Sequence, residues 1–318
     1  MAKRRKLKLR RQAKLGLLLI IVLIGLIIGG SKLFSEYRYR QTFEYKLMQM
    51  EYSQEDALKL IDNLSDKELI QILERDLDLN IPLFAYERYF LFRNLDRYID
   101  YLSDNKNVEH SMVVSLVNVQ RDHEFYEHLI KADTSKDYLM LINKYHYVEE
   151  DFVPEDIVRA SASYAYENRR LKRRAYEAFK TLADDAKRDG HTMVISSGYR
   201  TFAQQEEVWR SIYSLQGTRR ADQFAARPGH SEHHTGYAID IADFFDLEDN
   251  FGATESYQWM IINAYRFGFI LRYPKDKENI TGYSYEPWHF RYVGLEVAKY
   301  IQNNNITFDE YWEFYLAK

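Results

Sequence analysis

Two short stretches of the sequence carry side chains that together could hold a metal ion. The first reads SEHHTGYAID and the second reads EPWH. They offer His233, Asp240 and His289 as metal ligands, and Glu286 remains as a spare carboxylate. A catalytic zinc site needs three such ligands, a fourth position open for water, and a general base beside it. The pair of motifs therefore predicts a zinc hydrolase.

Asp240 lies in a predicted strand, residues 237–242, in which large and small side chains alternate. Tyr237 and two isoleucines share one face, while Asp240 shares the other face only with alanines. The small neighbours leave room for a metal ion on that face. His233 lies seven residues upstream, beyond Gly236, which lets the backbone turn. This spacing favours a ligand over a solvated acid at the edge of a sheet.

The second motif leads into another predicted strand, residues 288–292. Pro287 fixes an extended or kinked entry to this strand. We expect His289 to point at the metal from the strand, and Glu286, one bend earlier, to reach the water. A carboxylate in that position can take a proton from the water and deliver it to the leaving amine.

A third motif, SSGYRT, places Arg200 at a predicted turn from a strand to a helix. Thr201 and Gln204 have the spacing of a helix start. A position near a helix N-terminus suits an anionic group, and arginine can bind a carboxylate with two parallel contacts. The alternative is a solvated arginine in a loop.

Together these motifs resemble those of the VanY-type D-alanyl-D-alanine carboxypeptidases, zinc metallopeptidases related to D-Ala-D-Ala dipeptidases and the hedgehog signalling domain. The shared pattern is S-x-H-x-x-G-x-A-x-D, then E-P-W-H, preceded by S-G-Y-R with a glutamine five residues after the arginine. The resemblance covers about residues 133–303. It implies one zinc ion per chain, held by His233, Asp240 and His289. It also implies that Glu286 is the general base.

The same resemblance implies how a substrate is held. Arg200, Gln205 and Ser231 would bind the terminal carboxylate and the last residue of a peptidoglycan stem peptide, and Trp288 would form a wall of the pocket. Other histidines have no role in the shared pattern, and we expect them to be structural or solvated: His146, His191, His230 and His234.

Composition limits the remaining possibilities. The chain has 318 residues, enough for two domains or for one domain with appendages. It has no cysteine, so neither disulfides nor a cysteine-type structural zinc site can hold the fold. The first 14 residues contain 8 Lys and Arg and no acid, so the rest of the chain balances 36 bases against 48 acids. That negative balance disfavours nucleic acid as a partner of the folded part.

The N-terminal region predicts attachment to a membrane. Residues 15–30 read LGLLLIIVLIGLIIGG and contain no charged side chain. Extended to residue 34, this run is long enough for a transmembrane signal anchor. A cleaved signal peptide is the alternative, but no A-x-A-like cleavage site follows the run. The basic residues 1–14 should stay in the cytoplasm. We therefore expect a single-pass protein of the bacterial cell membrane whose C-terminal domain is extracellular.

The predicted fold class is α+β. A zinc carboxypeptidase domain, residues 133–318, should contain a small antiparallel sheet flanked by helices, since helices and strands mix without a regular βαβ rhythm. It follows the transmembrane helix and a small all-helical spacer, residues 35–132, in which serines precede acids at helix starts. A long amphipathic helix is expected from about residue 163 to residue 188.

Three functions fit these residues. The first is a membrane-anchored carboxypeptidase that removes the terminal D-alanine from peptidoglycan stem peptides. The second is an L,D-carboxypeptidase acting on tetrapeptide stems, which would share the zinc chemistry. The third is a non-catalytic, zinc-stabilised module that binds cell wall or protein, against which Glu286 and Arg200 argue. The sequence does not indicate the oligomeric state.

Overall fold

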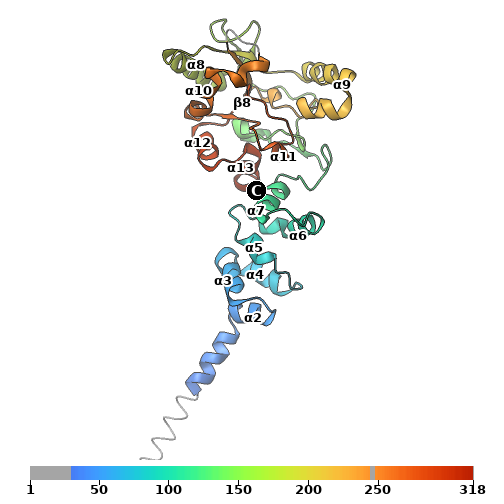
Figure 1. The fold of residues 1–318 in the computed structure, drawn as a ribbon, viewed down its shortest axis with the longest axis vertical. Coiled ribbons are helices and arrows are strands. Elements are labelled where there is room, and N and C mark those ends of the chain that lie inside the picture. The colour runs from blue at the N-terminus through green and yellow to red at the C-terminus, as the bar shows by residue number, and fades with distance from the viewer. Residues whose placement is uncertain (1–29, 244–247, 318) are drawn as a thin grey trace, which may run out of the picture. The chain divides into compact units, whose positions relative to one another are not determined.

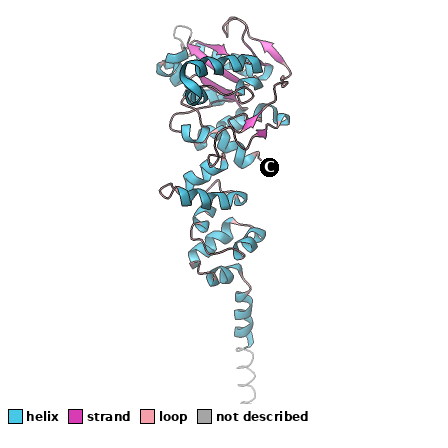
Figure 2. Cartoon of the chain, turned by 90° about the vertical axis from the view of Figure 1, so that its right-hand side faces the viewer, coloured by secondary structure: helices cyan, strands magenta, loops and turns pink. Residues whose placement is uncertain are grey.

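A computed structural model describes residues 30–243 and 248–317 of the chain (Figure 1). By internal contacts the chain divides into two compact units, Met1–Leu95 and Asp96–Lys318. All described strands lie in the second unit, whereas helices occur in both (Figure 2). The domain boundaries predicted from the sequence, including the one after residue 132, stay predictions.

The described part of the first unit is helical. Side-chain caps begin two of its helices: Ser53 accepts a hydrogen bond from the backbone of Asp56, and Ser65 and Glu68 form a reciprocal capping box. Both helix starts are as the serine–acid spacing predicts. The α-helices of this unit that lie wholly within the described residues are α2 (Phe43–Gln49), α3 (Gln54–Asn63), α4 (Asp66–Leu73) and α5 (Ile81–Ala85). Their fully buried side chains include Leu47, Ala57, Leu60, Ile72 and Phe84.

The second unit is built on a four-stranded antiparallel sheet with the order β5-β6-β8-β7. The strands are β5 (Met193–Ser197), β6 (Ala238–Asp243), β7 (Phe269–Leu271) and β8 (His289–Tyr292). The alternation predicted for β6 is present: Ile239 and Ile241 belong to the hydrophobic core, and Asp240 lies on the other face. In the pairing of β6 with β8, Asp240 lies directly opposite His289.

Helices surround this sheet (Figure 1). Helix α8 (Arg173–Arg188) packs its apolar stripe, which includes Ala175, Phe179 and Leu182, into the core. The other helices are α6 (Leu95–Asp104), α7 (His110–Asn118), α9 (Phe202–Phe224), α10 (Glu255–Asn263), α11 (Glu278–Thr281), α12 (Leu295–Asn304) and α13 (Phe308–Tyr315). Short 3₁₀ helices are η1 (Phe92–Asn94), η2 (Thr134–Leu139), η3 (Glu232–Thr235), η4 (Glu248–Ala253) and η5 (Ala264–Phe267).

The predicted α+β class with an antiparallel sheet is confirmed, but the start of one helix is wrong. The amphipathic helix predicted from about residue 163 begins at Arg173, because the preceding residues form a hairpin. Strand β3 (Ile157–Arg159) pairs with β4 (Arg170–Lys172), and Asn168 adopts the left-handed φ of 63° in the turn between them. The remaining two strands, β1 (Ile130–Lys131) and β2 (His146–Tyr147), are parallel.

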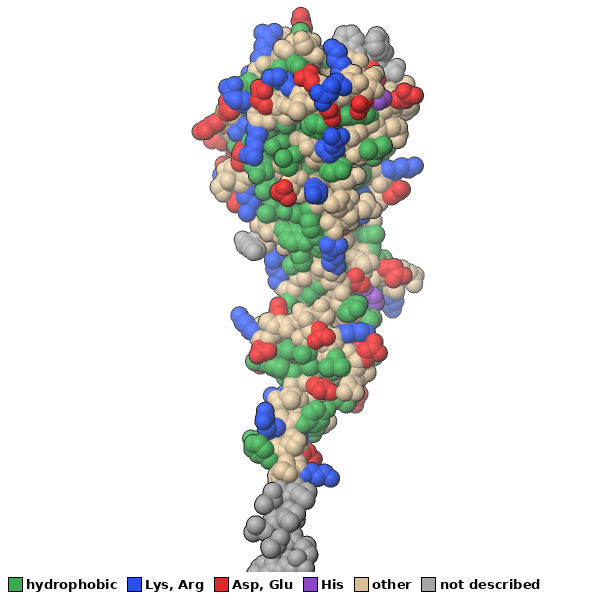
Figure 3. Space-filling view, turned by 90° about the vertical axis from the view of Figure 1, so that its left-hand side faces the viewer, with side chains coloured by type: hydrophobic (Ala, Val, Ile, Leu, Met, Phe, Trp, Pro, Cys, Tyr) green, Lys and Arg blue, Asp and Glu red, His purple; other side chains and the backbone are tan. Residues whose placement is uncertain are grey.

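The predicted transmembrane segment, residues 15–34, lies outside the described residues except for its last five positions. Within residues 30–243 and 248–317, no helix is long and apolar enough to cross a membrane. On the face shown in Figure 3, acidic and basic side chains are interspersed with hydrophobic ones over the described surface.

Candidate active site

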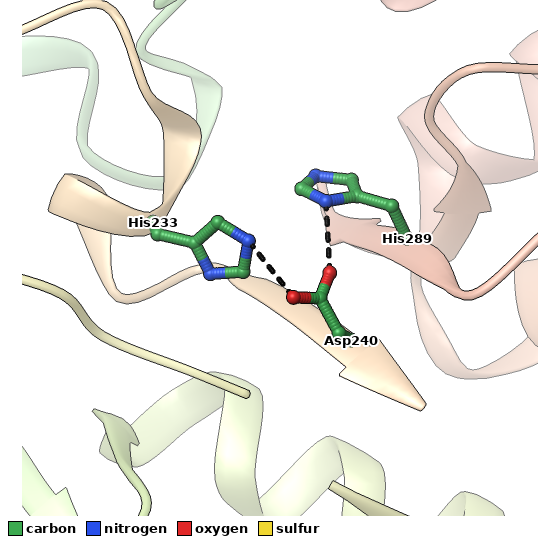
Figure 4. Close-up of side chains that lie close together, drawn as sticks. All are labelled: His233, Asp240 and His289. Carbon is green, nitrogen blue, oxygen red and sulfur yellow. Dashed lines mark hydrogen bonds and ion pairs between the residues drawn. The ribbon is translucent and has the colours of Figure 1, made fainter. Parts of the chain in front are cut away.

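Three buried side chains, His233, Asp240 and His289, converge between β6, β8 and the short helix η3 (Figure 4). Nε2 of His233 lies 3.3 Å from Oδ2 of Asp240, and Nδ1 of His289 lies 3.0 Å from Oδ1. One ligand atom from each residue can be chosen so that all lie within 4.8 Å of one another. The two imidazoles thus reach the two oxygens of one carboxylate from opposite sides.

Local hydrogen bonds fix the ring of His233. Ser231 caps η3, and its hydroxyl accepts a hydrogen bond from the backbone of His233. Nδ1 of His233 donates to the carbonyl of Gly198 over 2.7 Å, which leaves Nε2 free to bind a metal. A Cβ at Gly198 would lie 2.4 Å from the carbonyl oxygen of Arg170, so this position needs glycine to let β4 approach.

The charges of the site favour a bound cation. Burial alone would raise the pKa of the Asp240 carboxyl, but the neighbouring imidazoles and Arg200 hold that pKa well below its ordinary value. Burial and then the charge of Arg200 lower the pKa of His233, which favours the neutral ring, the form that binds metals. The pKa of His289 rises to about 9, against the effect of burial, because Asp240 and Glu232 flank the ring.

These donors fit a zinc ion. Two imidazole nitrogens and one carboxylate are a known catalytic ligand set, and three protein ligands leave a position for water or substrate. The ligand atoms of His233, Asp240 and His289 already lie within 4.8 Å of one another, so little movement of the chain is needed to close the shell. The three ligands predicted from the sequence therefore lie together, as expected.

Glu286 lies beside the ligands with its carboxylate inside the same cavity. Its Oε2 is 3.7 Å from Nδ1 of His289, and its side chain is 9% exposed. Burial, reinforced by Asp240, raises the pKa of Glu286 to about 7, although His289 opposes this shift. A carboxyl with a pKa near neutrality is suited to accept and return a proton.

All eight residues predicted for the site line one cavity of about 160 Å³. It brings together residues as far apart in the chain as Arg200 and His289, because the strands pair as described above. The eight are Arg200, Gln205, Ser231, His233, Asp240, Glu286, Trp288 and His289.

Arg200 is held where β5 turns into α9. Its guanidinium donates two hydrogen bonds to Ser197 and one of 2.8 Å to Oδ2 of Asp240. The side chain keeps 22% of its surface exposed and lines the cavity. Thr201 begins α9 with the predicted capping box, which places Gln205 in the first turn. Gln205 accepts a hydrogen bond of 3.3 Å from Arg200 and donates to the backbone of Ala226.

Several residues of the cavity were not predicted from the sequence. Glu232 occupies the second position of the first motif, which the shared pattern leaves unspecified. No local pattern in the sequence marks it as a site residue. The ring of Tyr273 lies 4.9 Å from that of His289 in a tilted arrangement, and the ring of Tyr283 lies tilted against Tyr273 in turn. Tyr273 follows β7, and the pairing of β7 with β8 brings it to His289. The apolar wall consists of Val208, Phe224, Ala225 and Ala226.

The other histidines have structural surroundings. Nδ1 of His234 donates to the carbonyl of Arg200, and its Nε2 accepts from the backbone of Gly229. Burial lowers the pKa of His146 to about 4. Nδ1 of His230 donates to the carbonyl of Asn143. His191 lies beside Trp259.

Known proteins resemble large parts of this chain. A profile of the family described as "VanY: D-alanyl-D-alanine carboxypeptidase" matches residues 168–295, which include all eight predicted site residues. Putative carboxypeptidase YodJ of Bacillus subtilis is 38% identical over 218 residues, 66% of this chain and 79% of that protein. The bifunctional D-Ala-D-Ala dipeptidase and D-Ala-D-Ala carboxypeptidase VanXYC of Enterococcus gallinarum is 34% identical over 188 residues, 57% of this chain and 95% of that protein. The solved structure of the LdcB LD-carboxypeptidase matches with a TM-score of 0.55 and 39% identity, covering 59% of this chain and 91% of that one.

Proposed function

Because the chain belongs to the VanY family of D-alanyl-D-alanine carboxypeptidases, which are zinc-dependent peptidases, we propose that it removes the terminal D-alanine from peptidoglycan stem peptides. The observation that carries this proposal is the shared cavity, in which the metal ligands, a buried carboxyl and a cavity-facing arginine lie together. Each of these groups serves one step of exopeptidase chemistry. A module that only binds would need no buried base.

His233, Asp240 and His289 would hold the zinc ion in this proposal. When bound, the ion supplies Lewis acidity, which polarises a carbonyl group and makes a water molecule more acidic. Glu286 takes the proton from the attacking water at its carboxylate and returns it to the nitrogen of the departing alanine. Its raised pKa makes both transfers accessible near neutral pH.

Arg200 would recognise the end of the peptide. The free α-carboxylate distinguishes a chain end from the middle of a chain, and a guanidinium can bind it with two parallel hydrogen bonds. Gln205 and Ser231 lie next to Arg200 in the cavity and supply further polar contacts. The apolar wall that includes Val208 and Ala225 suits the methyl group of alanine. Trp288 closes the cavity beside Glu286.

An L,D-carboxypeptidase is the second candidate, because the LdcB LD-carboxypeptidase is similar to this chain in both sequence and structure. The chemistry and the ligands would be the same. The difference is the configuration of the residue before the scissile bond, which is D in a pentapeptide stem and L in a tetrapeptide stem.

We also propose that residues 15–34 anchor the protein in the bacterial cell membrane with the catalytic unit outside. The apolar run and the basic residues that precede it support this arrangement. It would bring the cavity to the cell wall, where stem peptides are found.

Incubation of the purified, zinc-loaded chain with defined pentapeptide and tetrapeptide muropeptides tests the proposal. Mass spectrometry should show loss of one alanine from the pentapeptide and none from the tetrapeptide. Loss from the tetrapeptide alone would establish the L,D alternative. An absence of turnover on both substrates, with zinc content confirmed, would contradict both assignments.

A further inference from the structure

Glu232 lies next to a metal ligand in the sequence, but its side chain contacts a different ligand. His233 points toward Asp240, whereas Glu232 points toward Nε2 of His289, the ring nitrogen that does not face Asp240. Oε2 of Glu232 is 3.6 Å from Nε2 of His289. Both atoms are buried, and within the described part of the chain neither has a hydrogen-bond partner. Their separation is an ion-pair contact slightly longer than a hydrogen bond, so each unsatisfied atom faces the other.

A cluster of buried charges holds Glu232 in place. Arg272 donates from Nε to Oε1 of Glu232 over 2.8 Å. Nη1 of Arg291 lies 2.9 Å from the same oxygen as an ion pair without hydrogen-bond geometry. Both arginines and Glu232 are at most 1% exposed. With one oxygen bound to the arginines, the other oxygen is directed at His289.

The cluster extends to the last helix of the chain. Arg272 binds both carboxylate oxygens of Asp309, at 2.5 and 3.1 Å. Asp309 lies in the first turn of α13 and also accepts a hydrogen bond from Asn143. The cluster thus contains two basic and two acidic side chains. Such buried ion pairs are no more stabilising than a well-packed apolar core, so stability alone does not explain the cluster.

We propose that Glu232 is a positioning residue that accepts the Nε2–H of His289 and so presents Nδ1 of that ring to the metal. This inference rests on the proposed function, because it takes His289 to be a zinc ligand. A carboxylate acceptor fixes both the tautomer and the orientation of a metal-binding imidazole and makes it a stronger ligand. The two imidazoles would then be oriented differently, His233 by a neutral backbone carbonyl and His289 by an anion.

Two variants separate positioning from a merely structural role. Glu232→Gln and Asp309→Asn each remove one negative charge from the same buried cluster without a change of shape. Both should lower the unfolding temperature of the metal-free chain. Only Glu232→Gln alters the contact to His289, so Asp309→Asn is its matched control.

Zinc affinity, measured on the full chain by competition with a chromophoric chelator, gives the decisive readout. Glu232→Gln should bind zinc roughly 10- to 100-fold more weakly than the wild type, as is usual for loss of a group that orients a ligand, and Asp309→Asn should bind nearly as tightly as the wild type. The absorption spectrum of the cobalt-substituted protein should change in Glu232→Gln and stay unchanged in Asp309→Asn. Wild-type affinity in Glu232→Gln, or an equal loss in both variants, would overturn the proposal.

A further variant covers the case in which Glu232→Gln does not fold. Glu232→Asp keeps the charge of the cluster but withdraws the carboxylate from His289 by one methylene, so its zinc affinity should also fall. An unchanged affinity in Glu232→Asp would count against positioning. Because these readouts measure metal binding, a failure of the positioning role is distinguishable from a failure of the proposed function, which would show as absent turnover by the zinc-loaded wild type.

Discussion

The guanidinium of Arg200 donates a hydrogen bond of 2.8 Å to the carboxylate of Asp240, so the residue expected to bind the end of the substrate also contacts an expected metal ligand. Asp240 receives this contact on Oδ2, while His289 lies at Oδ1. The sequence alone would treat substrate recognition and metal binding as separate. Because the two residues are in direct contact, a variant at Arg200 has to be tested for substrate recognition and for metal binding.

Replacement of Arg200 should therefore be judged by its effect on substrate selection. Arg200→Lys keeps a positive charge near Asp240 but loses the planar fork, so zinc should be retained while kcat/KM falls roughly 10- to 100-fold, the equivalent of a charged hydrogen bond of about 1.5–3 kcal/mol. Metal analysis and steady-state kinetics on a pentapeptide measure the two effects.

The control for this prediction is a pentapeptide whose C-terminal carboxylate is amidated. The wild type should cleave it poorly, and Arg200→Lys should discriminate less between the acid and the amide. Equal rates of the wild type on both substrates would show that Arg200 does not recognise the chain end.

Replacement of His289 by alanine should abolish tight zinc binding. Two remaining ligands cannot form the usual first shell of three protein groups with one open position. Metal analysis after dialysis against a chelator should find about one zinc per chain in the wild type and almost none in the variant. His191→Ala, which removes a histidine that does not line the cavity, is the matched control and should keep its zinc. Full occupancy in His289→Ala would refute the ligand assignment.

Glu286→Gln should keep zinc but lose most turnover. The amide preserves the shape of the side chain and cannot accept the proton of the water, so general-base assistance of about 10²- to 10⁴-fold should disappear. The measurement is kcat on the pentapeptide at matched zinc content. A value close to that of the wild type would remove Glu286 from the mechanism.

Lys144 should make the stability of the protein depend on pH. Burial lowers the pKa of Lys144 to about 8, while its ammonium group donates to the carbonyl of Asp222. Between pH 8 and 10.5 the folded state loses this proton before the unfolded state does, so the free energy of unfolding should rise with pH through this window. Across the whole window this rise in the free energy of unfolding corresponds to about 3 kcal/mol.

Lys144→Met tests this expectation because it removes the titrating group and keeps an apolar side chain of similar length. Denaturant unfolding at several pH values should show that the free energy of unfolding of the variant exceeds that of the wild type most near pH 7. This difference should shrink toward pH 10.5. Lys299→Met, at an exposed lysine, should follow the pH dependence of the wild type. A difference in the free energy of unfolding between Lys144→Met and the wild type that does not change with pH would contradict the prediction.

The sequence by itself determined those features that depend on neighbours along the chain. The capping boxes at Ser65 and Thr201 are present as their spacing predicts, because a helix start needs only residues one turn apart. The alternation around Asp240 likewise determined which face of β6 carries the ligand. The site residues themselves could be selected because their types and order match a chemical requirement.

The tertiary structure alone decided which distant groups meet. The antiparallel register of β6 with β8 places Asp240 opposite His289, and no local pattern specifies this pairing. The contacts of Glu232 with His289 and with the arginine pair are likewise non-local, so the sequence offered no indication of them. Helix α8 is shorter than its apolar periodicity predicts. The residues just before it pair in the hairpin of β3 and β4, which satisfies their backbone hydrogen bonds without a helix. Local sequence thus specified the chemical groups, whereas long-range pairing and burial decided their contacts and their charges.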